Sequence, residues 1–119
     1  MITNFEDLTH ELSFEELAMI SDVSNIMSQF SKSNPIKCRD LVNRIKIHLA
    51  SNGIDVRFDE VRLRKLINHM RANGILPIIA TSKGYFVSYN HDDVCSQIQS
   101  LVERANSIEG CAKGLLKFT

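Results

Sequence analysis

Two Asn-Gly pairs, at positions 52–53 and 73–74, most constrain how this chain can fold. Glycine takes the left-handed conformation that ends a helix, so each pair predicts the end of one helix. After the second pair, the apolar residues change from helical spacing to two short runs, 76–80 and 85–89, which are rich in β-branched and aromatic residues. The chain is therefore predicted to have a mainly α fold that carries one small β-hairpin (α+β).

Three helices are predicted before the hairpin, over about residues 14–30 and 39–51 and from Asp59 to about residue 72. Ser13 and Glu16 have the spacing of a capping box, in which each side chain satisfies a free backbone amide at the start of the first helix. Each helix has one apolar face that predicts the core. The residues of these faces are Met19, Val23, Ile26, Met27, Phe30, Cys38, Leu41, Val42, Ile45, Leu49, Leu63, Leu66, Ile67 and Met70.

The hairpin and a last helix follow. Residues 81–84 lie between the two strand-like runs and end in Gly84, which is typical of a turn whose glycine takes a positive φ. The last helix begins after Asn90, and its apolar residues alternate in spacings of four and three over about three heptads, which predicts a seam for a second helix. The seam contains Val94, Ile98, Leu101, Ala105, Ile108, Ala112 and Leu115. We expect the first five to make a homodimer; the alternative is that the helix packs on the first helix of its own chain.

The charges of the chain are segregated, although they sum to zero. Residues 37–90 carry ten basic side chains against four acidic ones, a net charge of +6, whereas residues 1–36 carry six carboxylates against one lysine. A neutral protein does not need this separation to stay in solution. A basic middle segment that ends in a glycine-tipped hairpin indicates a module that faces a nucleic acid.

Three stretches carry a resemblance to a known family: residues 62–71 (RLRKLINHMR), 73–78 (NGILPI) and 82–86 (SKGYF). Together they resemble the wing region of winged helix-turn-helix transcription factors of the biotin-repressor and DeoR type. They are also similar to the small stand-alone winged-helix proteins of bacteriophage genomes. The resemblance covers residues 35–90 and implies a winged helix-turn-helix fold that binds duplex DNA. The chain differs from those repressors in lacking an effector or catalytic domain, and its connection over 51–58 is longer than usual.

The third helix supplies most of the candidate DNA-binding residues. Arginine can donate two parallel hydrogen bonds to guanine, asparagine can do the same with adenine, and lysine contacts phosphate as a point charge. Lys83 lies at the tip of the expected wing, where it could contact phosphates or the minor groove. The predicted DNA-binding residues are Arg39, Arg62, Arg64, Lys65, Asn68, His69 and Lys83, and Lys37 and Arg44 could also contact phosphate. The alternative is that these side chains form only the solvated face of an amphipathic helix.

We expect three regions within one compact domain: an acidic N-terminal helix region (1–34), the winged helix-turn-helix core (35–90) and a C-terminal helix (91–119). No apolar run is long enough to span a membrane, and the acidic N-terminus does not resemble a secretory signal. Three widely separated cysteines favour a reducing cytoplasm, which is that of the host if a phage encodes the protein.

The residue patterns do not indicate an enzyme. The four histidines lack metal-ligand spacing, there is no glycine-rich phosphate loop, and no nucleophile stands beside a base. We therefore expect no catalysis, no cofactor and no metal.

The leading hypothesis is sequence- or structure-directed binding of duplex DNA by a phage or mobile-element regulator of transcription or replication. Six carboxylates before residue 23 motivate the alternative, a winged-helix module that binds protein and acts as an inhibitor or adaptor of a host nucleic-acid enzyme. A third reading is an architectural subunit, which the heptad seam would permit.

Overall fold

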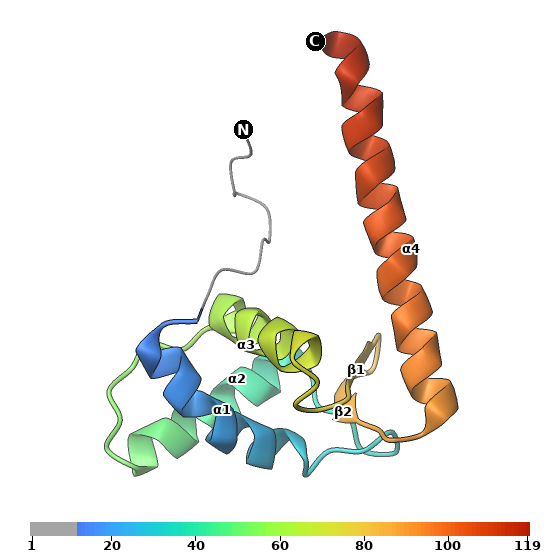
Figure 1. The fold of residues 1–119 in the computed structure, drawn as a ribbon. Coiled ribbons are helices and arrows are strands. Elements are labelled where there is room, and N and C mark those ends of the chain that lie inside the picture. The colour runs from blue at the N-terminus through green and yellow to red at the C-terminus, as the bar shows by residue number, and fades with distance from the viewer. Residues whose placement is uncertain (1–11) are drawn as a thin grey trace. The chain divides into compact units, whose positions relative to one another are not determined.

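The computed structural model describes residues 12–119 and has helices and strands in the predicted order (Figure 1). The fold class is confirmed: it is mainly α with a two-stranded antiparallel hairpin, in a winged-helix-like order with a C-terminal helix. The chain divides into two compact units, one ending at Val87 and the other spanning Ser88–Thr119. The elements are α1 (Phe14–Met27), α2 (Cys38–Ser51), α3 (Glu60–Ala72), β1 (Ile78–Thr81), β2 (Gly84–Val87), α4 (His91–Leu115) and the short 3₁₀ helix η1 (Leu116–Phe118).

Side-chain caps confirm the predicted starts of three helices, α1, α3 and α4. The Ser13 hydroxyl accepts a hydrogen bond from the Glu16 amide while the Glu16 carboxylate accepts one from the Ser13 amide, so both halves of the capping box are present. Asp59 caps α3 and Asn90 caps α4. The prediction that the first helix continues to Phe30 is wrong by three residues: α1 ends at Met27 because the chain tightens into a turn with i→i−3 hydrogen bonds.

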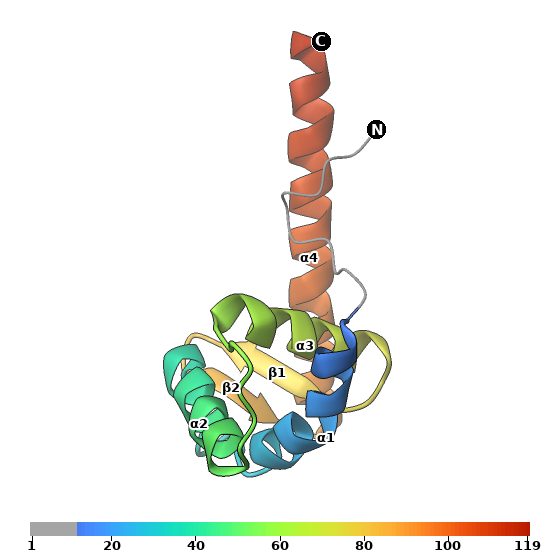
Figure 2. The same cartoon turned by 90° about the vertical axis from the view of Figure 1, so that its left-hand side faces the viewer.

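The core of the first unit is formed by the predicted apolar faces. Helix α3 contacts both α1 and α2, and in Figure 2 the three helices gather around the hairpin. The residues expected in the core are buried except Cys38, which is partly exposed. Ile36, Phe58, Leu76, Ile78, Ile79 and Phe86 join the core. Phe58 comes from the long connection between α2 and α3 and anchors its end in the core, whereas residues 52–55 are exposed.

The segment between α1 and α2 extends the hairpin, a feature that the sequence analysis did not predict. Ile36 exchanges two backbone hydrogen bonds with Tyr85 of β2, at N···O distances of 2.9 and 2.7 Å. On its other side β2 pairs with β1 in a register that sets Thr81 opposite Gly84. The wing turn thus consists of Ser82 and Lys83, and its return strand is hydrogen-bonded on both edges.

Gly84 has the positive φ that the sequence predicted, at +128°. A Cβ atom at this position would lie 2.4 Å from the Ile36 carbonyl oxygen, which is closer than such atoms approach. Glycine is therefore required here both by the backbone conformation and by the strand pairing.

Helix α4 forms the second unit together with the short η1. It runs for 25 residues without interruption, and none of these residues is buried. Gly110 and Gly114 lie inside the helix instead of ending it. Among residues 12–119, no helix combines the length and the apolar character needed to cross a bilayer.

Replacing Gly84 by Ala should lower the free energy of unfolding by about 3 kcal/mol, because the methyl group adds steric overlap to left-handed strain. Gly53→Ala is the matched control: Gly53 also has a positive φ, of +68°, but no atom lies within 4 Å of its added Cβ. It should cost only about 1 kcal/mol. Urea unfolding measures both values, and equal losses would show that the contact with Ile36 is unimportant.

Candidate nucleic-acid interface

The basic side chains of α3 divide between two sides of the helix. Arg64 is exposed, whereas Arg62 and Lys65 are each about one third exposed or less, at 31% and 26% of their side-chain surface. Residues 62 and 65 lie about 60° apart around a helix, while residue 64 lies well away from both. The predicted set of DNA-binding residues on α3 is therefore not presented on a single surface.

Arg62 and Lys65 face the buried carboxylate of Glu16 in α1. The Lys65 Nζ atom donates to Glu16 Oε1 at 2.8 Å, and Arg62 Nε lies 3.6 Å from Glu16 Oε2. The Glu16 side chain is 3% exposed. Arg62 also donates to the Arg57 carbonyl at 2.7 Å. We call Glu16, Arg62 and Lys65 the Glu16 cluster; it joins α1 to α3 through paired charges.

The charges of this cluster determine the ionisation of Glu16. Burial raises the pKa of the carboxyl, but the hydrogen bonds from Lys65 and Ser13 and the positive charge of Lys65 lower it. The net result is a pKa below the ordinary value of 4.5. Glu16 is therefore ionised at neutral pH and neutralises part of the positive charge of α3.

A second group of residues, three of them basic, lies where α2, α3 and the wing meet. Lys37 precedes α2, and its Nζ atom donates to the Ser82 carbonyl in the wing turn at 2.7 Å, which brings it beside Lys83. The positive charge of Arg64 acts to lower the pKa of both the Cys38 thiol and the Tyr85 hydroxyl, and Arg71 acts on Tyr85 in the same direction. We call this group the wing cluster; its members are Lys37, Cys38, Arg64, Lys83 and Tyr85.

The centre of the wing cluster is neutral. Burial is the main reason why the pKa of the Cys38 thiol and that of the Tyr85 hydroxyl lie above their ordinary values. Neither group carries negative charge at neutral pH, and the acidic residue that acts on Cys38 is Glu60. The positive charges around the centre thus outnumber this one carboxylate.

The surface of the wing cluster is hollowed. A shallow depression of about 240 Å³ runs between the start of α2 and the hairpin. Its lining residues are Lys37, Cys38, Ala80, Thr81, Ser82, Gly84 and Tyr85. Backbone and small side chains form most of this surface, so a phosphate group could approach closely.

The remaining predicted residues lie in different surroundings. Arg39 is exposed in the first turn of α2, and within residues 12–119 no carboxylate forms an ion pair with Arg39, Arg64 or Lys83. Asn68 and His69 are half-buried, and the His69 ring lies 3.4 Å from the Asn73 amide nitrogen.

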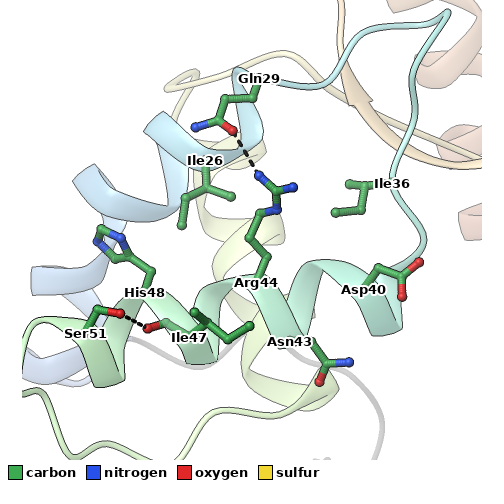
Figure 3. Close-up of a pocket in the computed structure, with 9 residues that line it drawn as sticks. All are labelled: Ile26, Gln29, Ile36, Asp40, Asn43, Arg44, Ile47, His48 and Ser51. Carbon is green, nitrogen blue, oxygen red and sulfur yellow. Dashed lines mark hydrogen bonds between the residues drawn. The ribbon is translucent and has the colours of Figure 1, made fainter.

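Arg44 lies in a groove between α1 and α2 (Figure 3). It donates to Gln29 at 3.2 Å and stacks over the Phe30 ring at 5.2 Å, so it is partly engaged within the fold. The groove has a volume of about 640 Å³. Ile47, one of its lining residues, is 67% exposed. The residues that line it are Ile26, Gln29, Ile36, Asp40, Asn43, Arg44, Ile47, His48 and Ser51.

Comparison of the chain with protein-family models, with curated proteins and with solved structures found no match. The winged-helix-like order of elements therefore rests on the structure alone. In the part of the chain that the structure describes, no three His, Cys, Asp or Glu residues are arranged to hold a metal ion.

Sequence reasoning missed the contacts that organise both clusters. The capping-box pattern identified Glu16 as a helix-start residue but gave no signal for its pairing with Lys65, which is 49 residues away. The link from Lys37 to Ser82 spans 45 residues and depends on the unpredicted pairing of Ile36 with Tyr85. Both are long-range contacts, for which a single sequence has no periodic signal.

Replacing Glu16 by Gln should lower the free energy of unfolding at neutral pH by about 2 kcal/mol, because Lys65 and Arg62 lose a buried counter-charge. The folded pKa of Glu16 is depressed, so its stabilisation is present above the unfolded pKa and is lost as the pH falls through the folded value. The difference between wild type and variant should therefore shrink as the pH is lowered below 4.5. Urea unfolding across this range measures it. Glu15→Gln changes an exposed neighbour and is the control; an equal loss there, or a difference that does not vary with pH, would contradict the assignment.

Proposed function

We propose that this protein binds duplex DNA through the wing cluster and the exposed side of α3, as a winged helix-turn-helix regulator of transcription or replication. The observation that carries the proposal is the hydrogen bond from Lys37 to Ser82, which ties the start of α2 to the wing turn beside Lys83. It supports one basic surface built from segments that are far apart in the sequence. The winged-helix-like order of elements supports the same function.

In this proposal α3 enters the major groove. Arg64 is its exposed basic residue, and its guanidinium can bond a guanine edge through two parallel donors. Lys83 lies in the wing turn and contacts the phosphates or the minor groove next to the α3 site. Lys37 and Arg39 flank the start of α2, where no side chain caps the helix and its first amides can bind phosphate.

The Glu16 cluster changes the roles that we propose for Arg62 and Lys65. Each would have to leave the Glu16 carboxylate to reach DNA, and this separation has a cost because the carboxylate is buried. We assign to them the positioning of α3 against α1. Arg64 then carries the principal base contact, and Asn68 and His69 remain predicted contacts on the same helix.

The groove in Figure 3 favours a second candidate function, binding of a protein partner. It is concave, and Ile47 exposes apolar surface beside Arg44. Such a groove could hold a side chain of a partner in an inhibitor or adaptor role. This function would use the α1–α2 side of the first unit and would not need the wing cluster.

Arg64→Ala should weaken duplex binding about tenfold or more, because a bidentate base contact is lost. Lys83→Ala should weaken binding to all duplexes alike. If about five phosphates are contacted, the logarithm of the association constant falls with the logarithm of salt concentration at a slope near −4.5, and loss of Lys83 should reduce this slope by about 0.9. Fluorescence anisotropy over a salt series measures both effects.

Lys117→Ala removes the same charge from the short helix η1 and is the matched control. It should leave the affinity and the salt slope unchanged. Equal effects of the three substitutions, or an affinity that does not depend on salt, would contradict the DNA-binding proposal.

Two simple assays separate the two candidate functions. The first is a gel shift with random duplex DNA, and the second is capture of lysate proteins on the full chain with and without nuclease. A gel shift that Arg64→Ala reduces supports DNA binding. Protein capture that withstands nuclease, is lost in Ile47→Asp and occurs without any gel shift supports the protein-binding alternative.

A further inference from the structure

Helix α4 carries an apolar seam that nothing in its own unit covers. None of its residues is buried, and four of its large apolar residues are more than half exposed: Ile98 55%, Val102 53%, Ile108 65% and Leu115 65%. Val94 and Leu101 of the seam are partly exposed. A helix of 25 residues is about 37 Å long. Exposed apolar side chains along such a length are typical of an interaction surface.

The pattern of the seam is that of a two-helix coiled coil. Counting from Ile98 as position a, the a residues are His91, Ile98, Ala105 and Ala112, and the d residues are Val94, Leu101, Ile108 and Leu115. All of them are apolar except His91, the first residue of the helix. The outer positions b, c and f carry polar residues or glycine throughout α4. The apolar surface is therefore restricted to one side, as a pairing helix requires.

The charges beside the seam select the partner and its direction. Arg104 occupies a g position, and Glu109 occupies the e position five residues later. In a parallel pair of helices, a g residue faces the e residue of the next heptad on the partner, so Arg104 of each chain meets Glu109 of the other. Glu109 already forms an ion pair with Lys113 of its own chain, at an N···O distance of 2.9 Å and with both side chains largely exposed.

We propose that α4 pairs with α4 of a second copy of this chain as a parallel coiled coil, with Arg104 of each copy paired to Glu109 of the other. The partner is a second copy of this chain because the two charged residues beside the seam, Arg104 and Glu109, are complementary to each other. The proposal is independent of DNA binding: it uses only α4 residues, and none of the wing-cluster residues.

The antiparallel arrangement is the competing one. An antiparallel pair in which a residues face d residues would set Ala105 against Ile108 and Ala112 against Leu101, which fills space well. The same register sets Arg104 opposite Cys111 and Glu109 opposite Val102, so the charges gain no partner. In the parallel arrangement, Arg104 and Glu109 of each copy both gain a partner of opposite charge. Substitutions at these two residues therefore distinguish the two arrangements.

Charge exchange is the main test, measured by sedimentation equilibrium of the full chain. Arg104→Glu and Glu109→Arg each place like charges opposite each other in a parallel dimer and should each raise the dimer dissociation constant on the order of tenfold. An equimolar mixture of the two variants restores opposite charges in every pair and should associate as tightly as wild type. Glu103→Arg, at an outer f position, is the matched control and should have no effect.

A seam variant and a cross-link complete the test. Ile108→Asp should raise the dissociation constant on the order of a hundredfold because it buries a charge, whereas its outer neighbour Ser107→Asp should not. In a chain with its three cysteines replaced by serine, Leu101→Cys should form a covalent dimer under mild oxidation, since d residues face each other in a parallel pair.

Three results would overturn the proposal. The first is a wild-type chain that stays monomeric at every concentration tested. The second is no rescue by the mixture of charge variants. The third is a cross-link that forms only between Leu101→Cys chains and Ala112→Cys chains, which would show the antiparallel arrangement. Loss of DNA binding alone would leave the proposal unaffected.

Discussion

The pairing of Ile36 with Tyr85 is the constraint on which the rest of the first unit depends. Two backbone hydrogen bonds hold the segment before α2 against the return strand of the hairpin. The next two residues along the chain, Lys37 and Cys38, are thereby carried to the wing turn. Gly84 makes this approach possible, because any Cβ would collide with the Ile36 carbonyl. The backbone hydrogen bonds between Ile36 and Tyr85 therefore determine both the geometry of the wing and the position of the wing cluster.

A second constraint acts on charge. The basic excess of residues 37–90 suggested one continuous positive surface, but the buried carboxylate of Glu16 binds two of its members, Arg62 and Lys65. A carboxylate with so little exposed surface is stable only when it is paired, so these contacts serve the packing of α1 on α3. The positive charge that is available to a partner is consequently smaller than the sequence total. The net charge of a segment says how many charged groups it has, but not which of them are paired inside the fold and which reach the surface.

The sequence predicted local structure well and long-range contacts poorly, for physical reasons. Helix caps at Ser13, Asp59 and Asn90 involve neighbours within a few residues, and periodicity located the buried faces of α1, α2 and α3. The pairing of Ile36 with Tyr85 and that of Glu16 with Lys65 join segments that only the folded chain brings together. The sequence pattern predicts a solvated face of the third helix that includes Arg62 and Lys65, but a face that is solvated in an isolated helix can be covered by another helix.

The two proposals have a combined consequence that neither has alone. The first unit ends at Val87 and α4 begins at His91, so a parallel pair of α4 helices connects both first units to the same end of the coiled coil. Two DNA-binding surfaces that are tethered in this way would meet one duplex together, and the second binding step would become intramolecular. Half-sites for such a dimer are commonly separated by about one helical turn of DNA, roughly 34 Å. Weak contacts from a small wing cluster could then suffice, because affinity would come from linkage as well as from each surface. The segregation of charge in the first unit and of apolar residues in α4 is consistent with this division of roles.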